Sequence, residues 1–308
     1  MKSFEELIAV SGVEVRSAVS MAALCTYRVG GSARWFASVD SEAELRALGE
    51  AVAGAAEPPA VLVVGRGSNL LVSDSGFEGL AVQLGDGLAR ISTDGHTMTA
   101  GGAASLPVVA RRSVAESLSG FEWAVGVPGT IGGAVRMNAG GHGSDMSEVL
   151  VGVRVVDLRT GETREVDAAA LELSYRSSAL DAHEVVTSAD LALVPGDRER
   201  GEALLADIVR WRRENQPGGH NAGSVFTNPA GDSAGRLIDE AGCKGLRIGS
   251  AEVSPKHANF IQADEGGSAD DVHALMHEVI RRVRHTSGVE LHAETRLVGF
   301  DRDAGASR

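Results

Sequence analysis

Apolar side chains recur every three or four residues along five stretches of the chain, the spacing of one face of an α-helix. In residues 270–288, for example, a stripe that includes Val272, Val279 and Val283 stops at Gly288, and glycine commonly terminates helices. The same spacing predicts helices over five ranges, which are residues 40–55, 105–118, 197–215, 233–242 and 270–288.

A second pattern, short β-branched runs between turn residues, predicts strands. Residues 60–65 are a continuous apolar run typical of a buried strand, and residues 185–196 predict another. Two hairpins are expected, with turns at Asp94-Gly95 and near Thr160-Gly161. A further short strand is predicted at residues 257–262. Together these elements indicate an α+β fold, with a change from strands to charged helix near residue 196.

Composition narrows the class of protein. The chain has 308 residues and a formal net charge of −13, which argues against nucleic acid as its main partner. Its two cysteines, Cys25 and Cys243, lack the spacing of a metal site or disulfide framework and suit a reducing compartment. No apolar run reaches the ~18 residues of a membrane span, and the N-terminus does not read as a signal peptide. We expect a cytoplasmic protein that binds no membrane.

The loop GRGSNLL at residues 65–71 follows a predicted buried strand. Its Gly-x-Gly start is shared with dinucleotide-binding motifs, but Leu70 replaces the third glycine and a turn follows where a Rossmann helix would begin. Successive backbone N–H groups in such a turn can bind an anion, although a plain turn between strands would have the same sequence.

Seven glycines crowd into residues 126–143. Each glycine inside a regular element costs about 0.5–1 kcal/mol, so a cluster implies that backbone geometry or a close neighbour requires it. A flexible linker is the alternative, but Val127, Ile131 and Val135 make the stretch more apolar than a linker needs to be. Two glycine-rich loops in one α+β domain suggest an extended cofactor with a pyrophosphate and a flat ring.

Eight segments in order give the chain a family resemblance: TYRVGG, GRGSNLLVSDSGFEG, GVPGTIGGAVRMNAG, LSYRSS, NAGSVFTNP, GRLIDEAGCKG, VSPKHANFI and ELHAETRLVG. They resemble the UDP-N-acetylenolpyruvoylglucosamine reductases (the MurB family) of peptidoglycan precursor synthesis. The similarity covers residues 20 to 300. It is closest to the shorter type in that family, because no long insertion follows LSYRSS.

The resemblance implies an FAD-binding domain of the vanillyl-alcohol-oxidase (PCMH) type at residues 1–195. It implies a UDP-sugar-binding domain at residues 196–287 and a segment at 288–308 that returns to the first domain. FAD would be held tightly but not covalently, with NADPH as co-substrate. The implied cofactor-binding residues are Tyr27, Gly65, Arg66, Gly67, Ser68, Asn69, Leu70, Gly129, Thr130, Gly132, Gly133 and Asn138. A monomer is expected.

The implied reaction reduces an enol ether of a UDP-sugar, so charge builds beside a carboxylate and a carbon must then be protonated. By resemblance, Ser224 is the proton donor, and Arg176 and Glu294 stabilise the enolate. A guanidinium suits this task because its forked donors fit a carboxylate. Without the resemblance, a surface arginine, a loop serine and an exposed strand glutamate would be the simpler interpretations.

Candidate substrate contacts follow from the same matches, at Tyr175, Asn228, Lys244, His257 and Arg296. The alternative for each is a solvated surface residue. The chain departs from the family at Thr227, where lysine is common, and at His142, where tyrosine is frequent.

Three further interpretations have less support. The helical pair His273 and His277 has metal-ligand spacing, but no third ligand accompanies it, so no metal site is predicted. Another flavin oxidoreductase of the same fold would explain the glycine loops but not the Ser224 and Glu294 segments. A non-catalytic UDP-sugar-binding protein would not need Arg176, Ser224 and Glu294 together.

Overall fold

A computed structural model describes residues 2–300 of the chain. The chain divides into two compact units, each built from separated segments. Unit 1 comprises the chain up to Ser17, Trp35–Gly65 and Gly79–Arg212, and unit 2 comprises Ala18–Arg34, Arg66–Glu78 and the chain from Arg213 onward. The division at residues 196 and 288 stays a prediction, and part of its last segment, residues 301–308, lies outside the described residues.

All five predicted helices are present, and two more accompany them. The helices are α1 (Phe4–Ser11), α2 (Glu42–Gly54), α3 (Leu106–Ala115), α4 (Ile131–Arg136), α5 (Arg198–Asn215), α6 (Ala234–Glu240) and α7 (Ala269–Ser287). Ser3 begins α1 with a capping box to Glu6, a signature that was present in the sequence. The other unexpected helix, α4, lies inside the glycine-rich stretch, where Thr130 caps it through the N–H of Gly133 at 3.3 Å.

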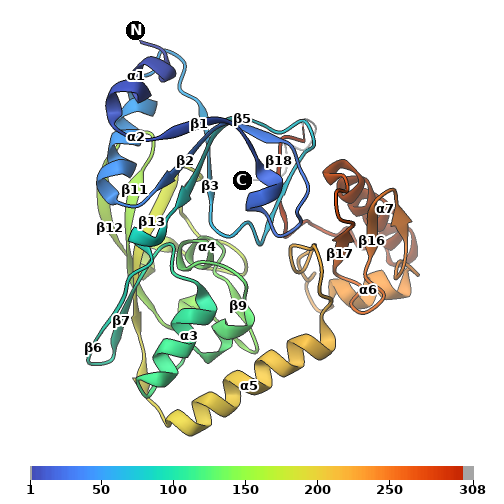
Figure 1. The fold of residues 1–308 in the computed structure, drawn as a ribbon. Coiled ribbons are helices and arrows are strands. Elements are labelled where there is room, and N and C mark those ends of the chain that lie inside the picture. Colours follow the sequence, from blue (N-terminus) through green and yellow to red (C-terminus); the bar gives the residue numbers. More distant parts are fainter. Residues whose placement is uncertain (1, 301–308) are drawn as a thin grey trace. The chain divides into compact units, whose positions relative to one another are not determined.

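Unit 1 contains an antiparallel sheet of five strands in the order β12-β11-β13-β7-β6 (Figure 1). Both predicted hairpins belong to it, β6 (Ile91–Asp94) with β7 (Thr97–Gly101) and β11 (Leu150–Asp157) with β12 (Thr163–Asp167). The fifth strand, β13 (Glu184–Ala192), lies between the two hairpins and pairs with β11 and β7. A core that includes Val109, Phe121, Ile131 and Leu191 joins this sheet to α3 and α4. These apolar contacts fix the glycine-rich stretch in place.

A second sheet has the order β1-β2-β5-β3, with β1 (Val15–Ser20), β2 (Ser32–Val39), β3 (Ala60–Val64) and β5 (Phe77–Leu84). In unit 1, β3 pairs in parallel with β5. The strand predicted at 60–65 is thereby confirmed over Ala60–Val64, but only Leu62 and Val64 of it are buried. Leu45, Leu48 and Val52 of α2 pack in a core with Leu80 and Val82 of β5. Ser41 caps α2 by accepting a hydrogen bond from the N–H of Glu44.

Unit 2 contains a three-stranded antiparallel sheet of β15 (Arg247–Ile248), β16 (Ala251–Val253) and β17 (Ile261–Ala263), against which α7 packs (Figure 1). The strand predicted at 257–262 is therefore only partly right, because it begins at Ile261. A turn precedes it, in which the N–H of Phe260 donates to the carbonyl of His257. Small pairs complete the chain's strands, namely β4 (Leu70–Val72) with β18 (Arg296–Val298), β8 (Leu118–Ser119) with β14 (Val194–Pro195), and β9 (Gly140–Gly141) with β10 (Ser144–Asp145).

Candidate active site

The segment after Ser224 is held by hydrogen bonds from two other parts of unit 2. The N–H of Val225 donates to the carbonyl of Asn259 at 2.9 Å. The carbonyl of Val225 accepts from the N–H of Glu294 at 2.8 Å. Two of the predicted catalytic residues, Ser224 and Glu294, therefore lie on adjoining stretches of backbone, 70 residues apart in sequence.

The loop at residues 65–71 also contacts the chain around Glu294. Its last residues form β4, which pairs in parallel with β18, so that Leu70 lies opposite Arg296. The side-chain amide of Asn69 donates to the carbonyl of Glu294 at 3.0 Å, and the N–H of Arg296 donates to the carbonyl of Asn69 at 3.0 Å. A predicted cofactor residue, a predicted catalytic residue and a predicted substrate residue are thus brought together within unit 2. Desolvation lowers the pKa of Arg296.

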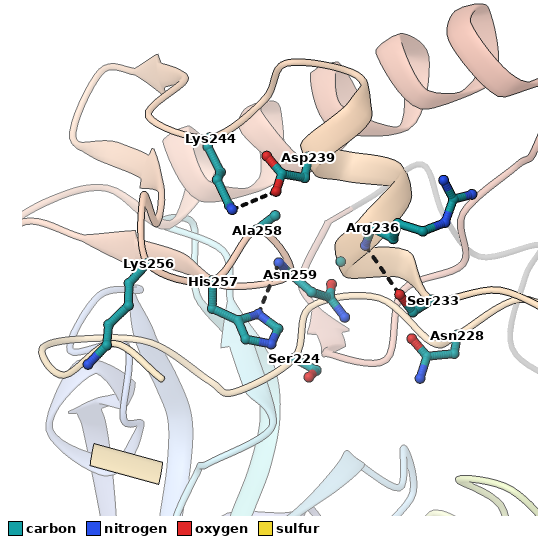
Figure 2. A pocket seen from close by; sticks show the side chains of 11 residues that line it. Ser224, Asn228, Ser233, Arg236, Asp239, Lys244, Lys256, His257, Ala258 and Asn259 are labelled. Carbon is teal, nitrogen blue, oxygen red and sulfur yellow. Dashed lines mark hydrogen bonds and ion pairs between the residues drawn. The ribbon is translucent and has the colours of Figure 1, made fainter. Parts of the chain in front are cut away.

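Ser224 also lines a pocket of about 390 Å³, which lies wholly within unit 2 (Figure 2). Three predicted substrate residues share its wall with the serine, namely Asn228, Lys244 and His257. Sequence reasoning missed the pocket residues Arg236, Lys256 and Asn259. Lys256 directly precedes His257, and that pair of basic residues was an available signal.

The cations of the pocket are partly compensated. Lys244 Nζ lies 2.6 Å from a carboxylate oxygen of Asp239, and Arg236 is paired with Asp232 and Glu240. Lys256 Nζ instead donates to the carbonyl of Arg213 at 2.6 Å, a partner without formal charge. The pocket therefore keeps positive charge in an acidic protein, which suits an anionic ligand.

His257 enters the pocket as a neutral ring at pH 7. Desolvation, together with the nearby charge of Lys244, holds its pKa below the usual 6.5. Its Nδ1 accepts a hydrogen bond from the N–H of Asn259 at 3.3 Å, which leaves Nε2 as the ring's potential donor. The ring also packs edge-on against Phe260, with centroids 4.7 Å apart.

Asn228 has a structural role as well as a place in the pocket. Its side-chain oxygen accepts the N–H of Ala234, the first residue of α6, at 3.0 Å. Its amide nitrogen remains as a donor for a ligand. Thr227, a departure from the family pattern, donates through its hydroxyl to the carbonyl of His292 at 3.3 Å.

Arg176 lies in unit 1, in a tight turn from Ser174 to Ser177 whose end residues exchange two backbone hydrogen bonds of 3.1 Å. Its φ of 57° is in the left-handed region, which is uncommon for a residue with a side chain and is often found at functional sites. The guanidinium lies 5.0 Å from the ring centre of Tyr175 and donates to the carbonyl of Gly140 at 3.3 Å. Tyr175 is 55% exposed, whereas Arg176 is half-buried.

Asn138, a predicted cofactor residue, supports that turn. Its amide donates to the carbonyl of Ser174 at 3.1 Å, and its oxygen accepts the N–H of Ser147 at 3.0 Å. The residue is buried, with a φ of 38°. His142, the second departure from the family pattern, packs edge-on against Trp211, and desolvation followed by the charge of Arg212 lowers its pKa.

The glycines in these loops serve packing within the chain. A Cβ on Gly65 would lie 2.7 Å from the hydroxyl of Thr130, and one on Gly67 would lie 2.2 Å from the carbonyl oxygen of Leu24. Gly67 also has a positive φ of 61°. Close approach of protein to protein thus accounts for Gly65 and Gly67, as the alternative of a plain turn between strands allowed.

Residues of unit 2 nevertheless have the chemistry to bind the pyrophosphate part of FAD. The N–H groups of Gly67, Ser68 and Asn69 donate to no protein acceptor within residues 2–300, as a pyrophosphate-binding turn requires. The exposed Arg66 adds a cation to the same turn. Tyr27 is fully buried in the core of this unit, and its hydroxyl has no hydrogen-bond partner among the described residues.

Unit 1 holds the other predicted cofactor residues. Thr130 caps α4, and Gly129 accepts the N–H of Leu106 through its carbonyl at 3.1 Å. The N–H of Gly132 donates to the carbonyl of Gly102 at 2.9 Å, which ties the start of α4 to the loop after β7. Gly133 is exposed, so this end of the helix presents backbone at the surface.

Two family models match this chain. One describes an FAD-binding domain and matches residues 33–167, and the other describes the C-terminal domain of UDP-N-acetylenolpyruvoylglucosamine reductase and matches residues 215–298. This pair of domains defines an FAD-dependent oxidoreductase.

Similar proteins identify the family within this class of oxidoreductases. A UDP-N-acetylenolpyruvoylglucosamine reductase of Paramagnetospirillum magneticum is 43% identical, over 92% of each chain. One of Heliobacterium modesticaldum is 42% identical, over 89% of this chain and 87% of its own length. The crystal structure of the Thermus caldophilus enzyme has a TM-score of 0.79 at 34% identity, covering 93% of this chain and 98% of its own. The chain belongs to the UDP-N-acetylenolpyruvoylglucosamine reductase family.

The family, the α+β class with its FAD-binding domain, and FAD as cofactor are thereby confirmed. The roles of individual residues stay predictions. The structure brings Ser224, Asn228, Lys244 and His257 to one pocket, and it joins Asn69, Glu294 and Arg296 through the backbone. Among residues 2–300 no cluster of three or more metal-ligating side chains is found, and no helix is long and apolar enough to cross a membrane.

Proposed function

We propose that this chain reduces UDP-N-acetylglucosamine enolpyruvate to UDP-N-acetylmuramate in the cytoplasm, as a step of peptidoglycan precursor synthesis, with NADPH as the electron source. Membership of the family supports the reaction. The observation that carries the assignment is the hydrogen bond that joins the Ser224 segment to Glu294 beside a cationic pocket. A proton donor and an acidic partner are needed together by a reaction that protonates a carbon next to a carboxylate.

The pocket of unit 2 supports binding of the UDP part of the substrate. A diphosphate requires cations and N–H donors, and Lys244, Lys256 and His257 Nε2 supply them. In this role Lys244 would exchange part of its contact with Asp239 for the phosphate. The amide nitrogen of Asn228 adds a neutral donor.

FAD would be held by the N–H groups and Arg66 of the loop at 65–70 and by Tyr27 in unit 2. The glycines and Thr130 at the start of α4, with Asn138, would hold it in unit 1. When bound, FAD would supply the hydride-transfer chemistry that links NADPH to the enolpyruvyl double bond.

Side chains of the protein stabilise the negative charge that develops on the substrate and supply the proton that completes the reaction. Arg176 binds the substrate carboxylate, where negative charge accumulates as the double bond is reduced. Ser224 donates the proton of its hydroxyl to the carbon next to that carboxylate, which completes the saturated lactyl ether. Solvent then returns a proton to the serine oxygen. Glu294, next to the Ser224 segment, would stabilise the enolate in its neutral acid form, whose O–H donates a hydrogen bond to the enolate.

The direct test follows the oxidation of NADPH by the purified protein, with and without the enolpyruvyl UDP-sugar. The preparation should be yellow, and oxidation should depend on the sugar. NADPH oxidation at the same rate with and without the sugar would indicate a different flavin oxidoreductase. A colourless protein that cannot be reconstituted with FAD would contradict the whole proposal. Stable binding of the sugar without turnover would favour a non-catalytic binding protein.

A further inference from the structure

Asn259 is buried beside the Ser224 segment, with 4% of its surface exposed. Its side-chain oxygen accepts the N–H of Phe226 at 3.0 Å, and its side-chain nitrogen donates to the carbonyl of Phe226 at 2.8 Å. Its own carbonyl accepts the N–H of Val225 at 2.9 Å. One residue thus makes three hydrogen bonds to the two residues that immediately follow Ser224.

The carboxamide of Asn259 makes the two hydrogen bonds to the backbone of Phe226 that a neighbouring strand would otherwise make. It offers a donor and an acceptor in one plane, which is what the N–H and carbonyl of a single extended residue require. The other flank of this segment is bonded to the chain around Glu294, through Val225 at 2.8 Å and through the N–H of Thr227 to His292 at 2.9 Å.

The chain before Ser224 supplies less restraint. Gly223 has a φ of 75° and open space within 4 Å of where a Cβ would be. Its N–H is bonded only locally, to the side chain of Asn221 at 3.0 Å. Ala222 before it is buried in the core of unit 2, so Gly223 is the least restrained neighbour of the serine. On the other side the serine is joined directly to Val225 and Phe226, which Asn259 holds.

We propose that Asn259 is a positioning residue that holds Ser224 where its hydroxyl can protonate the substrate carbon. This inference rests on the proposed function for the role of Ser224. The physical reason is distance, because a proton donor acts within about 2.6–3.2 Å of its acceptor. A displacement of about 1 Å can cost ~10²-fold in rate.

Two substitutions separate positioning from general stability. Asn259→Ala removes both side-chain hydrogen bonds. Asn259→Asp keeps them only while the new carboxyl is protonated, because the neutral acid has one donor and one acceptor whereas the carboxylate only accepts. Burial raises the pKa of such a carboxyl and brings this change toward the neutral range.

The experiment is stopped-flow kinetics on the FAD-loaded protein, with flavin reduction by NADPH and reoxidation by the enolpyruvyl UDP-sugar measured separately. Asn259→Ala should slow reoxidation about 10- to 100-fold and raise its solvent deuterium isotope effect, while reduction stays within about twofold. The reoxidation rate of Asn259→Asp, relative to the parent, should rise as the pH is lowered. Asn259→Ala should show no such rise.

Leu275→Ala is the matched control, because Leu275 is fully buried in the core of the same unit and makes none of these hydrogen bonds. It should lower thermal stability and leave the isotope effect and the pH profile unchanged. A flat pH ratio for Asn259→Asp, or parental reoxidation by Asn259→Ala, would overturn the proposal. If Asn259→Ala does not fold, the Asp variant decides alone.

Hydrogen exchange provides a readout that does not depend on the reaction. The amides of Val225 and Phe226 should exchange faster in the Asn259 variants than in Leu275→Ala at matched stability. Unchanged exchange would refute the positioning role even in an active enzyme. Faster exchange in a protein without sugar-dependent NADPH oxidation would instead keep the positioning of Ser224 and reject the proposed function.

Discussion

The side-chain amide of Asn69 donates a hydrogen bond of 3.0 Å to the carbonyl of Glu294. The backbone of Asn69 completes the connection by accepting the N–H of Arg296 at 3.0 Å. The loop expected to bind the pyrophosphate and the strand expected to carry an enolate-stabilising residue are therefore one hydrogen-bonded structure. What disturbs one should disturb the other.

Asn69→Ala should weaken both functions at once. Loss of one hydrogen bond costs about 0.5–1.5 kcal/mol, which corresponds to roughly a twofold to tenfold weaker retention of FAD. The turnover of the enzyme saturated with FAD should also fall, because the backbone of Glu294 loses its restraint. Fluorescence titration of FAD and steady-state kinetics check the two effects. Weaker FAD binding with parental turnover at saturation would contradict the connection to Glu294.

Ser224→Ala should separate the two halves of the reaction. Reduction of the flavin by NADPH needs no proton from Ser224 and should proceed at the parental rate. Reoxidation by the UDP-sugar should slow by about 10²- to 10⁴-fold, the usual contribution of a positioned proton donor. Stopped-flow absorbance of the flavin measures both steps. Parental reoxidation in this variant would remove Ser224 from the mechanism.

Stability should decrease in mildly acidic solution because of His257. Its pKa is lowered in the folded state relative to 6.5, so below that value the unfolded chain binds a proton that the folded chain does not. The free energy of unfolding should therefore fall as the pH drops from 7 through 6.5 and toward the lower folded pKa. Urea unfolding of the parent and His257→Gln between pH 5 and 8 tests this. The variant should show a shallower decline over that window, and an equal slope would exclude the histidine as a cause.

Gly67→Ala should destabilise the protein more than a positive φ alone explains. At Gly67 a Cβ would meet the carbonyl oxygen of Leu24 at 2.2 Å, in addition to the strained φ of 61°. Gly266 has a similar φ of 67° and nothing within 4 Å, so Gly266→Ala measures the backbone cost by itself, about 1–2 kcal/mol. Denaturant unfolding of both variants gives the difference. Equal losses would show that the loop moves away from Leu24 without cost.

Sequence patterns predicted those elements that are specified by their own residues, without contacts from distant parts of the chain. The apolar stripe of α7, its end at Gly288 and the hairpin turn at Asp94-Gly95 were all found where expected. It did not predict α4, because a glycine-rich helix held by Thr130 and by its neighbours has little helical propensity of its own. The strand from residue 257 was too long for a similar reason, since backbone contacts turn that segment around Phe260.

The candidate site was predicted in part. Resemblance supplied Ser224, Asn228, Lys244 and His257, and the structure gathers these four in one pocket. Asn259 was not found, because its importance comes from hydrogen bonds to a residue 33 positions away. The pairing between β4 and β18 was equally hidden, because its register joins distant segments and no local pattern records it.

The assembly of unit 2 from distant segments has a consequence for the order of events on the ribosome. Its segment Arg66–Glu78 includes β4, whose partner β18 is some 220 residues further along the chain. At about 5–20 residues per second, translation leaves β4 unpaired for on the order of ten to forty seconds. Unit 1 is complete in sequence by Arg212 and can fold earlier. During this interval the apolar run Leu70–Val72 is without the strand that pairs with it in the finished unit.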